Sequence, residues 1–305
     1  MVMNRHPILE MRGITKDFPG VRALNHIDLD IYPSKVHGLV GENGAGKSTL
    51  LKILSGALQN DEGKIQINGT PVLRLTPKIS QGFGVTVIYQ DFNLVPHLSI
   101  ARNIFLGHES QTGSRFILRQ KRMNQKSKDL LISLGINLDP RRFVADLTVA
   151  EKQMVEIARA LSLDSKIVLM DEPSAPLSEH EVKFLFRTIQ MLKERGVAIV
   201  YVSHRLEEIF QIADRVSILR DGSLMTTRSI SEIDMNEVIR LMVGRDIIDH
   251  YPKESFSPGA LILEVRSVKG REDISLRVFE KEVVGIAGLV GSGRSELARS
   301  VFGAL

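Results

Sequence analysis

The chain has 305 residues, of which 43% are hydrophobic and 25% charged, with a formal net charge of +4. This is the composition of a soluble globular protein of about two domains. No apolar run reaches the roughly 18 residues of a membrane-spanning helix, and residues 1–10 have no apolar core of signal-peptide length. Cysteine is absent, which excludes a disulfide scaffold and fits a reducing compartment. We therefore expect a cytoplasmic protein.

Short strands are predicted in the first part of the chain. Apolar and polar residues alternate there, which is the pattern of half-buried strands. A turn at residues 17–20 separates the first two strands and indicates an antiparallel hairpin. Two further strands are expected around the Asn68-Gly69 turn. The expected strands are residues 8–14, 24–31, 36–40, 63–68 and 71–73.

A glycine-rich loop follows the strand at residues 36–40. It reads Gly41-Glu42-Asn43-Gly44-Ala45-Gly46-Lys47-Ser48-Thr49 and fits the pattern G-x-x-x-x-G-K-[ST] of phosphate-binding loops. The glycines let the backbone curl so that successive N–H groups point at an anion. This chemistry places Lys47 on the β- and γ-phosphates of a nucleotide and the Ser48 hydroxyl on Mg²⁺. Residues 50–58 are the predicted helix whose N-terminus faces the phosphates.

Further strands and a helical insertion are predicted downstream of the loop. Residues 167–170 and 197–202 are almost wholly apolar, which is typical of parallel strands covered on both faces. The pattern between about residues 99 and 163 is mostly helical, and a closing helix is expected at 236–243. Additional strands are expected at residues 84–89 and 215–219.

Polar side chains stand directly after three of these strands. Asp171 and Glu172 form one carboxylate pair, and we expect Asp171 to hold Mg²⁺ and Glu172 to polarise the attacking water. Gln90 is expected to bind Mg²⁺ and sense the γ-phosphate. His204 is expected to contact the γ-phosphate and hold the water near Glu172. Earlier in the chain, Phe18 is expected to stack on adenine, with a small packing role as the alternative.

The basic stretch at residues 115–128 contains six Lys and Arg residues. Such a stretch can bind a membrane surface or nucleic acid. Only Phe116 interleaves with the basic residues, so stacking on bases has little support. We interpret the stretch as the solvated face of a helix.

The loop occurs a second time near the end of the chain. Residues 283–305 align with residues 36–58 without a gap, and ten of the 23 positions are identical. Arg294 stands where the first copy has Lys47. A planar guanidinium does not replace a compact ammonium, so we expect the second site to hydrolyse ATP poorly or not at all.

Together these residues resemble the ATP-binding cassette (ABC) ATPases, and most closely the double-cassette ATPases of bacterial ribose, galactose and xylose importers. The stretches that carry the resemblance are residues 93–99, residues 147–161 (LTVAEKQMVEIARAL) and residues 288–295 (GLVGSGRS). The implied fold is α/β, a P-loop NTPase cassette. It has a mostly parallel core sheet, an antiparallel β subdomain and a helical subdomain, followed by the opening strands and P-loop of a second cassette.

The family's signature Leu-Ser-Gly-Gly-Gln reads Leu147-Thr148-Val149-Ala150-Glu151 here. The resemblance implies that the Thr148 hydroxyl binds the γ-phosphate of a nucleotide held by an opposite cassette. Val149 and Ala150 add side chains where close approach normally needs glycine. Glu151 places a carboxylate near an anion, which is unfavourable unless it points away. We expect this signature to serve a weaker site.

The resemblance implies an ATP-hydrolysing subunit, with ATP and Mg²⁺, that energises a sugar importer from the cytoplasmic face of the cell membrane. Its implied partners are membrane permease subunits, through them a periplasmic or lipid-anchored sugar-binding protein, and a second cassette or homodimer partner, but no nucleic acid. We expect residues 1–245 to form the first cassette, 246–258 a linker and 259–305 the truncated start of a second cassette. A full second unit would bring the length to roughly 500 residues.

Two alternatives stay open. One is a soluble tandem-cassette ATPase that acts on ribosomes or nucleic acid. Such proteins usually keep Leu-Ser-Gly-Gly-Gln and a long charged helical linker, and this sequence has neither. The other is a chain that binds ATP without hydrolysing it, because the opposite signature is missing.

Overall fold

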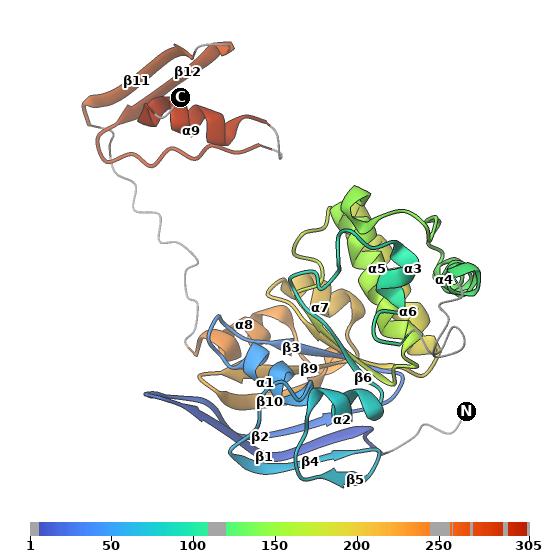
Figure 1. Cartoon of the computed structure of the whole chain (residues 1–305). Helices are drawn as coiled ribbons and strands as arrows, with labels where there is room; N and C mark the ends of the chain where they lie inside the picture. Colours follow the sequence, from blue (N-terminus) through green and yellow to red (C-terminus); the bar gives the residue numbers. More distant parts are fainter. Residues whose placement is uncertain are drawn as a thin grey trace. The chain divides into compact units, whose positions relative to one another are not determined.

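The computed structural model describes residues 6–108, 120–244, 257, 259–268, 271–288 and 292–303. The chain forms two compact units, Met1–Asp246 and Ile247–Leu305 (Figure 1). The expected linker at 246–258, apart from residue 257, and the first part of the basic stretch lie outside the described residues. None of the described helices is both long and apolar enough to cross a bilayer.

The first unit contains an antiparallel sheet with the strand order β2-β1-β4-β5 (Figure 1). β1 pairs with β2 from Leu9 opposite Ile31 to Phe18 opposite Val21, so the first predicted hairpin is confirmed. The strands are β1 (Leu9–Phe18), β2 (Val21–Ile31), β4 (Glu62–Ile67) and β5 (Thr70–Val72).

A six-stranded sheet forms the centre of the unit, in the order β10-β9-β3-β8-β7-β6. Five strands are parallel, and β10 runs antiparallel to β9 at one edge. The sequence did not predict β10, because Ser and Thr dominate it and no apolar alternation marks it. The strands are β3 (Val36–Val40), β6 (Val85–Ile88), β7 (Ile167–Asp171), β8 (Ala198–Val202), β9 (Arg215–Arg220) and β10 (Ser223–Ser229).

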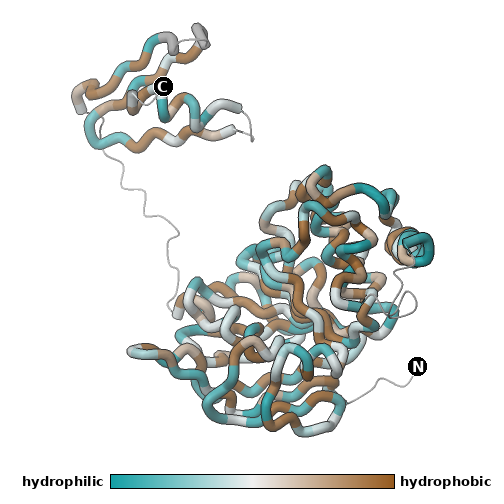
Figure 2. The backbone as a smooth tube through the Cα atoms, in the orientation of Figure 1, coloured by the Kyte–Doolittle hydropathy of each residue, from teal (hydrophilic) through white to brown (hydrophobic). Residues whose placement is uncertain are grey.

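The predicted helical insertion contains α3 (Ile100–Ile104), α4 (Gln120–Ser133) and α5 (Val149–Ser162). Loops and a short 3-10 turn at Val144–Asp146 separate α4 from α5, so the stretch is less helical than expected. The described part of the basic stretch lies on α4. This helix buries Met123 and Leu131 and is largely hydrophilic on its outside (Figure 2), so the interpretation as a solvated helix face is confirmed for these residues.

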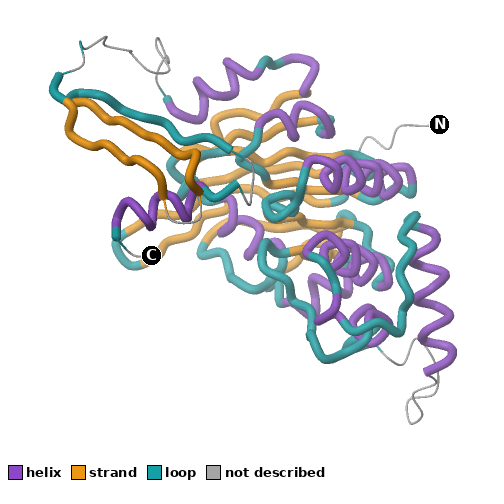
Figure 3. The backbone as a smooth tube through the Cα atoms, turned by 90° about the horizontal axis from the view of Figure 1, so that it is seen from above, coloured by secondary structure: helices purple, strands orange, loops and turns teal. Residues whose placement is uncertain are grey.

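The other helices surround the strands of the unit (Figure 3). The helix after the phosphate loop begins at Lys47, inside the motif and not at residue 50 as predicted, and ends at Leu54. The closing helix is confirmed. The helices are α1 (Lys47–Leu54), α2 (Pro77–Gly82), α6 (Glu179–Glu194), α7 (Leu206–Ile212) and α8 (Met235–Val243), with a 3-10 turn at Ile230–Glu232.

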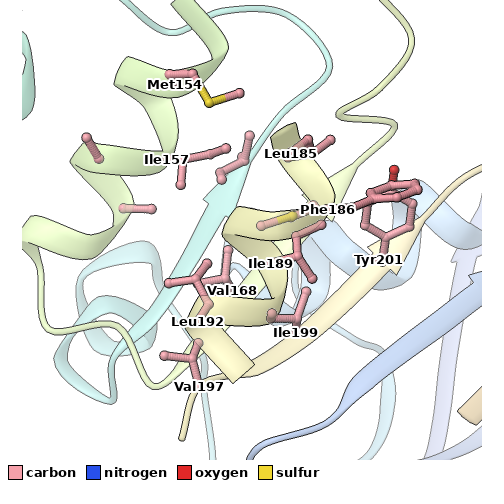
Figure 4. Packing of buried hydrophobic residues seen from close by; sticks show 14 of the residues in the cluster. Met154, Ile157, Val168, Leu185, Phe186, Ile189, Leu192, Val197, Ile199 and Tyr201 are labelled. Carbon is pink, nitrogen blue, oxygen red and sulfur yellow. The ribbon is translucent and has the colours of Figure 1, made fainter. Parts of the chain in front are cut away.

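The six-stranded sheet is buried on both faces, as its apolar strands predict. Successive side chains of a strand point to opposite faces. Leu169 therefore packs with α1 and the antiparallel sheet, and Val168 packs with α5 and α6. Figure 4 shows this second core, where Tyr201 of β8 lies edge-on to Phe186 of α6 with ring centroids 6.3 Å apart. Each large apolar side chain buried in this way contributes about 1.5–3 kcal/mol to the stability of the fold.

The second unit has a hairpin of β11 (Leu261–Val268) and β12 (Arg271–Phe279) and the helix α9 (Arg294–Phe302). Gly293 precedes α9 with φ 87°, as Gly46 precedes α1 with φ 101°, so the junction between glycine and helix recurs in the second unit. Residues 283–288 align with β3 but form no strand, and Val283 is 97% exposed. β3 is a strand because β8 and β9 supply backbone partners on both sides.

His37 of β3 leads to a prediction about pH. The ring is buried, with Nε2 2.8 Å from Ser217 Oγ of β9. Burial, with a smaller effect of Arg215, lowers the pKa of His37 from 6.5 to about 3. The unfolded chain therefore binds a proton that the folded chain excludes. The contribution of His37 to the free energy of unfolding is present in full above pH 6.5. It is lost as the pH falls from 6.5 to about 3.

We expect the free energy of unfolding to fall by up to about 1.4 kcal/mol per pH unit from this group alone in that window. Urea denaturation from about pH 7 to about pH 4, beside the His37→Asn variant, measures the effect. The variant should show the shallower pH dependence. Equal slopes for both proteins would contradict the assignment.

Candidate functional site

The phosphate loop joins β3 to α1, and two of its glycines have no room for a side chain. Gly46 has φ 101°, and a Cβ there would lie 2.6 Å from the carbonyl oxygen of Ala23. A Cβ on Gly41 would collide with the carbonyl oxygen of Leu219. The motif glycines therefore let β2 and β9 pack directly against the loop.

Lys47 lies at the start of α1 and is only 7% exposed. Its Nζ donates hydrogen bonds to the carbonyl oxygens of Gly41 at 2.7 Å and Glu42 at 2.9 Å. Burial lowers the pKa of Lys47, against the opposing effect of Glu172 and Asp171. The ammonium is thus held by its own loop and faces two carboxylates.

Asp171 ends β7, where it is paired with Val202 of β8. Burial, and next the nearby Glu172, raise the pKa of Asp171, while Lys47 and a hydrogen bond with the Ser48 side chain act to lower it. Two of the three predicted Mg²⁺ ligands, Asp171 and Ser48, are therefore hydrogen-bonded to each other. Carboxylate and hydroxyl oxygens are ligands that Mg²⁺ accepts, together with phosphate oxygens and water. The residues present fit this ion.

Glu172 follows directly in the left-handed backbone region, with φ 48°. Its N–H donates to the carbonyl oxygen of Val202 at 3.0 Å. A non-glycine residue in this region costs of order 1–3 kcal/mol, and such strain gathers at functional sites. Its Oε2 lies 3.2 Å from Nδ1 of His204, which is 55% exposed. The ends of β7 and β8 thus bring Glu172 and His204 together.

Three other predicted site residues lie on or beside other elements. Gln90 is exposed, two residues after β6. Phe18 ends β1, is 41% exposed, and has the Lys16 ammonium 5.7 Å from its ring centroid. Thr148 precedes α5. Within the described part of the chain, no side-chain hydrogen bond or ion pair joins these three to the phosphate loop. Their roles stay predictions.

The signature segment forms a capping box at the start of α5. The Thr148 hydroxyl accepts the N–H of Glu151 at 3.2 Å, and Glu151 Oε2 accepts the N–H of Thr148 at 2.8 Å. Arg142 Nη1 lies 2.8 Å from the other carboxylate oxygen. Burial acts to raise the pKa of Glu151, but the Thr148 and Arg142 hydrogen bonds outweigh it and lower the pKa. The unfavourable charge noted in the sequence is therefore neutralised locally.

A buried carboxylate beside the site was missed by sequence reasoning. Glu208 of α7 accepts hydrogen bonds from Ser174, Tyr201 and Ser203. The only signal in the sequence is the position of Ser203 directly before His204 and of Ser174 shortly after Glu172.

Two glycines of the loop provide a matched test of the packing. Gly46→Ala combines backbone strain with the collision at Ala23, whereas Gly44 has φ 86° and open space around the position of a Cβ. Strain alone costs roughly 1–2 kcal/mol. We expect Gly46→Ala to lower the free energy of unfolding clearly more than Gly44→Ala in urea denaturation. A smaller loss for Gly46→Ala would show that the loop does not pack against β2 as described.

Residues 24–175 match the family model described as ABC transporter. The chain is 50% identical over 301 residues to ribose import ATP-binding protein RbsA 1 of Rubrobacter xylanophilus, covering 97% of this chain and 60% of that protein. It is 44% identical over 300 residues to RbsA of Geobacillus kaustophilus, covering 97% of this chain and 61% of that protein. The chain thus spans about three fifths of the length of these curated relatives.

Among solved structures, the ADP conformation of MJ1267, an ATP-binding cassette of an ABC transporter, matches with a TM-score of 0.69 and 22% identity. The match covers 78% of this chain and 99% of that chain. At this identity it shows the fold, and the predicted cassette fold is confirmed.

Proposed function

The chain belongs to the ABC transporter ATP-binding family, and from this we propose that it binds ATP with Mg²⁺ and hydrolyses it to energise sugar import. The observation that carries the proposal is the joint placement of Lys47, Ser48, Asp171 and Glu172 at one edge of the sheet. The arrangement unites a phosphate cradle, a Mg²⁺-compatible oxygen pair and a general base.

The chemistry follows from the contacts of these residues. Lys47 exchanges the two carbonyl oxygens of its loop for phosphate oxygens. Asp171 and Ser48 would hold Mg²⁺, and the bound ion would neutralise charge on the phosphates. Glu172 accepts a proton from the attacking water. His204 lies 3.2 Å from the Glu172 carboxylate and fixes the orientation of that carboxylate.

We propose a bacterial monosaccharide importer as the setting, because the two relatives described above are named ribose import ATP-binding proteins. The sugar itself would be chosen by a binding protein and a permease. Residues 1–245 would act as the first cassette, and 259–305 carry the opening of a second. The signature at Thr148 would serve the nucleotide of an opposite cassette, in the same protein or in a second copy. A solved bacterial cassette, MJ0796, is dimeric.

A cavity of about 580 Å³ lies between α2, β6 and α5, and we propose it as the docking site for the permease. Its lining includes Tyr89, Asn93, Glu156 and Arg159. Glu156 Oε1 accepts the N–H of Asn93 at 2.8 Å, and Arg159 donates to the carbonyl oxygen of Asn93 at 2.8 Å. These hydrogen bonds link the segment after Gln90 to the signature helix α5. A force that the permease exerts at the cavity would therefore act on both elements.

Binding to membranes tests the transport setting. We expect the purified chain to bind inside-out vesicles that contain the permease of a bacterial ribose importer, and not vesicles without it. Arg159→Ala should weaken this binding, whereas Lys64→Ala, on the exposed face of β4, should leave it unchanged. Equal binding to both kinds of vesicle would contradict the proposed partner.

A further inference from the structure

Glu208 is a buried acid that three hydroxyl groups surround. It lies on α7 and is 6% exposed. Its Oε2 accepts hydrogen bonds from Ser174 Oγ at 2.6 Å, Tyr201 Oη at 2.8 Å and Ser203 Oγ at 3.0 Å. Arg205 Nη1 lies 3.4 Å from Oε1. A buried carboxylate is costly unless it is hydrogen-bonded, and this one accepts three donors on a single oxygen.

The three donors come from different places in the fold. Ser174 lies two residues after Glu172, and Ser203 directly precedes His204. Tyr201 lies inside β8, where its ring packs on Phe186 (Figure 4). One carboxylate oxygen therefore ties together the two segments that carry Glu172 and His204.

This tie explains how the Glu172–His204 contact is kept. Both residues stand just past strand ends, where one backbone hydrogen bond, from the N–H of Glu172 to the carbonyl oxygen of Val202, still joins the two segments. Glu172 also holds a strained φ of 48°. Hydrogen bonds to a charged acceptor are roughly twice as strong as neutral ones. Fixing Ser174 and Ser203 to one point limits how far the two segments can move apart.

We infer that Glu208 is a positioning residue for ATP hydrolysis. It holds the Glu172 and His204 side chains next to each other without touching the nucleotide. The inference rests on the proposed function. A merely structural role of Glu208 is the competing account, and in that case all three hydroxyl donors should matter equally.

Three single-atom deletions separate the two accounts. Ser174→Ala, Ser203→Ala and Tyr201→Phe each remove one hydroxyl from Glu208. We expect comparable losses of unfolding free energy in urea. At saturating MgATP, the two serine variants should hydrolyse ATP about tenfold more slowly or worse, because small misplacements of reacting groups are costly. Tyr201→Phe should stay close to the wild-type rate, and ATP affinity should be unchanged in all three. Equal rates for the three variants would overturn the inference.

A second readout works even if the wild-type chain does not hydrolyse ATP, which would be a failure of the proposed function. The ring resonances of His204, assigned with His204→Asn, report its surroundings directly. Ser174→Ala, 30 positions from His204 in sequence, should shift them, and Tyr201→Phe should not. Unshifted His204 resonances in Ser174→Ala would overturn the inference independently of activity.

Discussion

Replacing Glu172 with glutamine is expected to slow ATP hydrolysis by about 10²–10⁴-fold while ATP binding is retained. The amide keeps the shape of the side chain and its contact with His204 but cannot accept the proton of the attacking water. The left-handed backbone at Glu172 and its hydrogen bond to Val202 do not involve the carboxylate, so the fold should be preserved.

Phosphate release at saturating MgATP and equilibrium ATP binding measure the two effects separately. Glu207→Gln is the matched control, because Glu207 is exposed on α7. That variant should behave as wild type. Unchanged hydrolysis in Glu172→Gln would show that another group takes the proton.

Removal of Lys47 is expected to weaken ATP binding by about a hundredfold. Hydrogen bonds to charged groups contribute about 1.5–3 kcal/mol each, and Lys47 has two carbonyl partners to exchange for phosphate oxygens. Lys47→Arg should not restore binding. The guanidinium is larger and planar, whereas Lys47 is only 7% exposed and its ammonium is hydrogen-bonded to its own loop.

Titration with ATP in the presence of Mg²⁺ measures this loss. Lys64→Ala removes an exposed lysine from β4 and serves as the charge-matched control. Near-wild-type affinity in Lys47→Ala, or full affinity in Lys47→Arg, would mean that the loop backbone alone holds the phosphates.

The parts of the site that the sequence predicted are those set by local pattern and by sheet topology. The phosphate loop is a contiguous motif. Asp171 and His204 could be assigned to one edge because the carboxyl ends of parallel strands converge there. The start of α1 was placed too late, because the helix begins within the motif at Lys47, whose residue type gives no apolar signal.

The parts that escaped prediction depend on tertiary contacts. The pairing of Glu151 with Arg142 joins residues nine apart across a loop. The Glu208 cluster gathers hydroxyls from β8 and from the segment after β7. Strand formation itself also depends on tertiary contacts. Residues 36–40 and 283–287 share a pattern, yet among the described residues only the first has neighbouring strands.

Phosphate release from MgATP by the purified chain, followed as a function of chain concentration, shows whether the chain hydrolyses ATP. We expect Mg²⁺-dependent release that rises with the square of the concentration at low concentration, because one copy's signature at Thr148 completes the site of another copy. ATP binding without release would contradict hydrolysis by this chain, although not the nucleotide site. Absence of both binding and release would contradict the account as a whole.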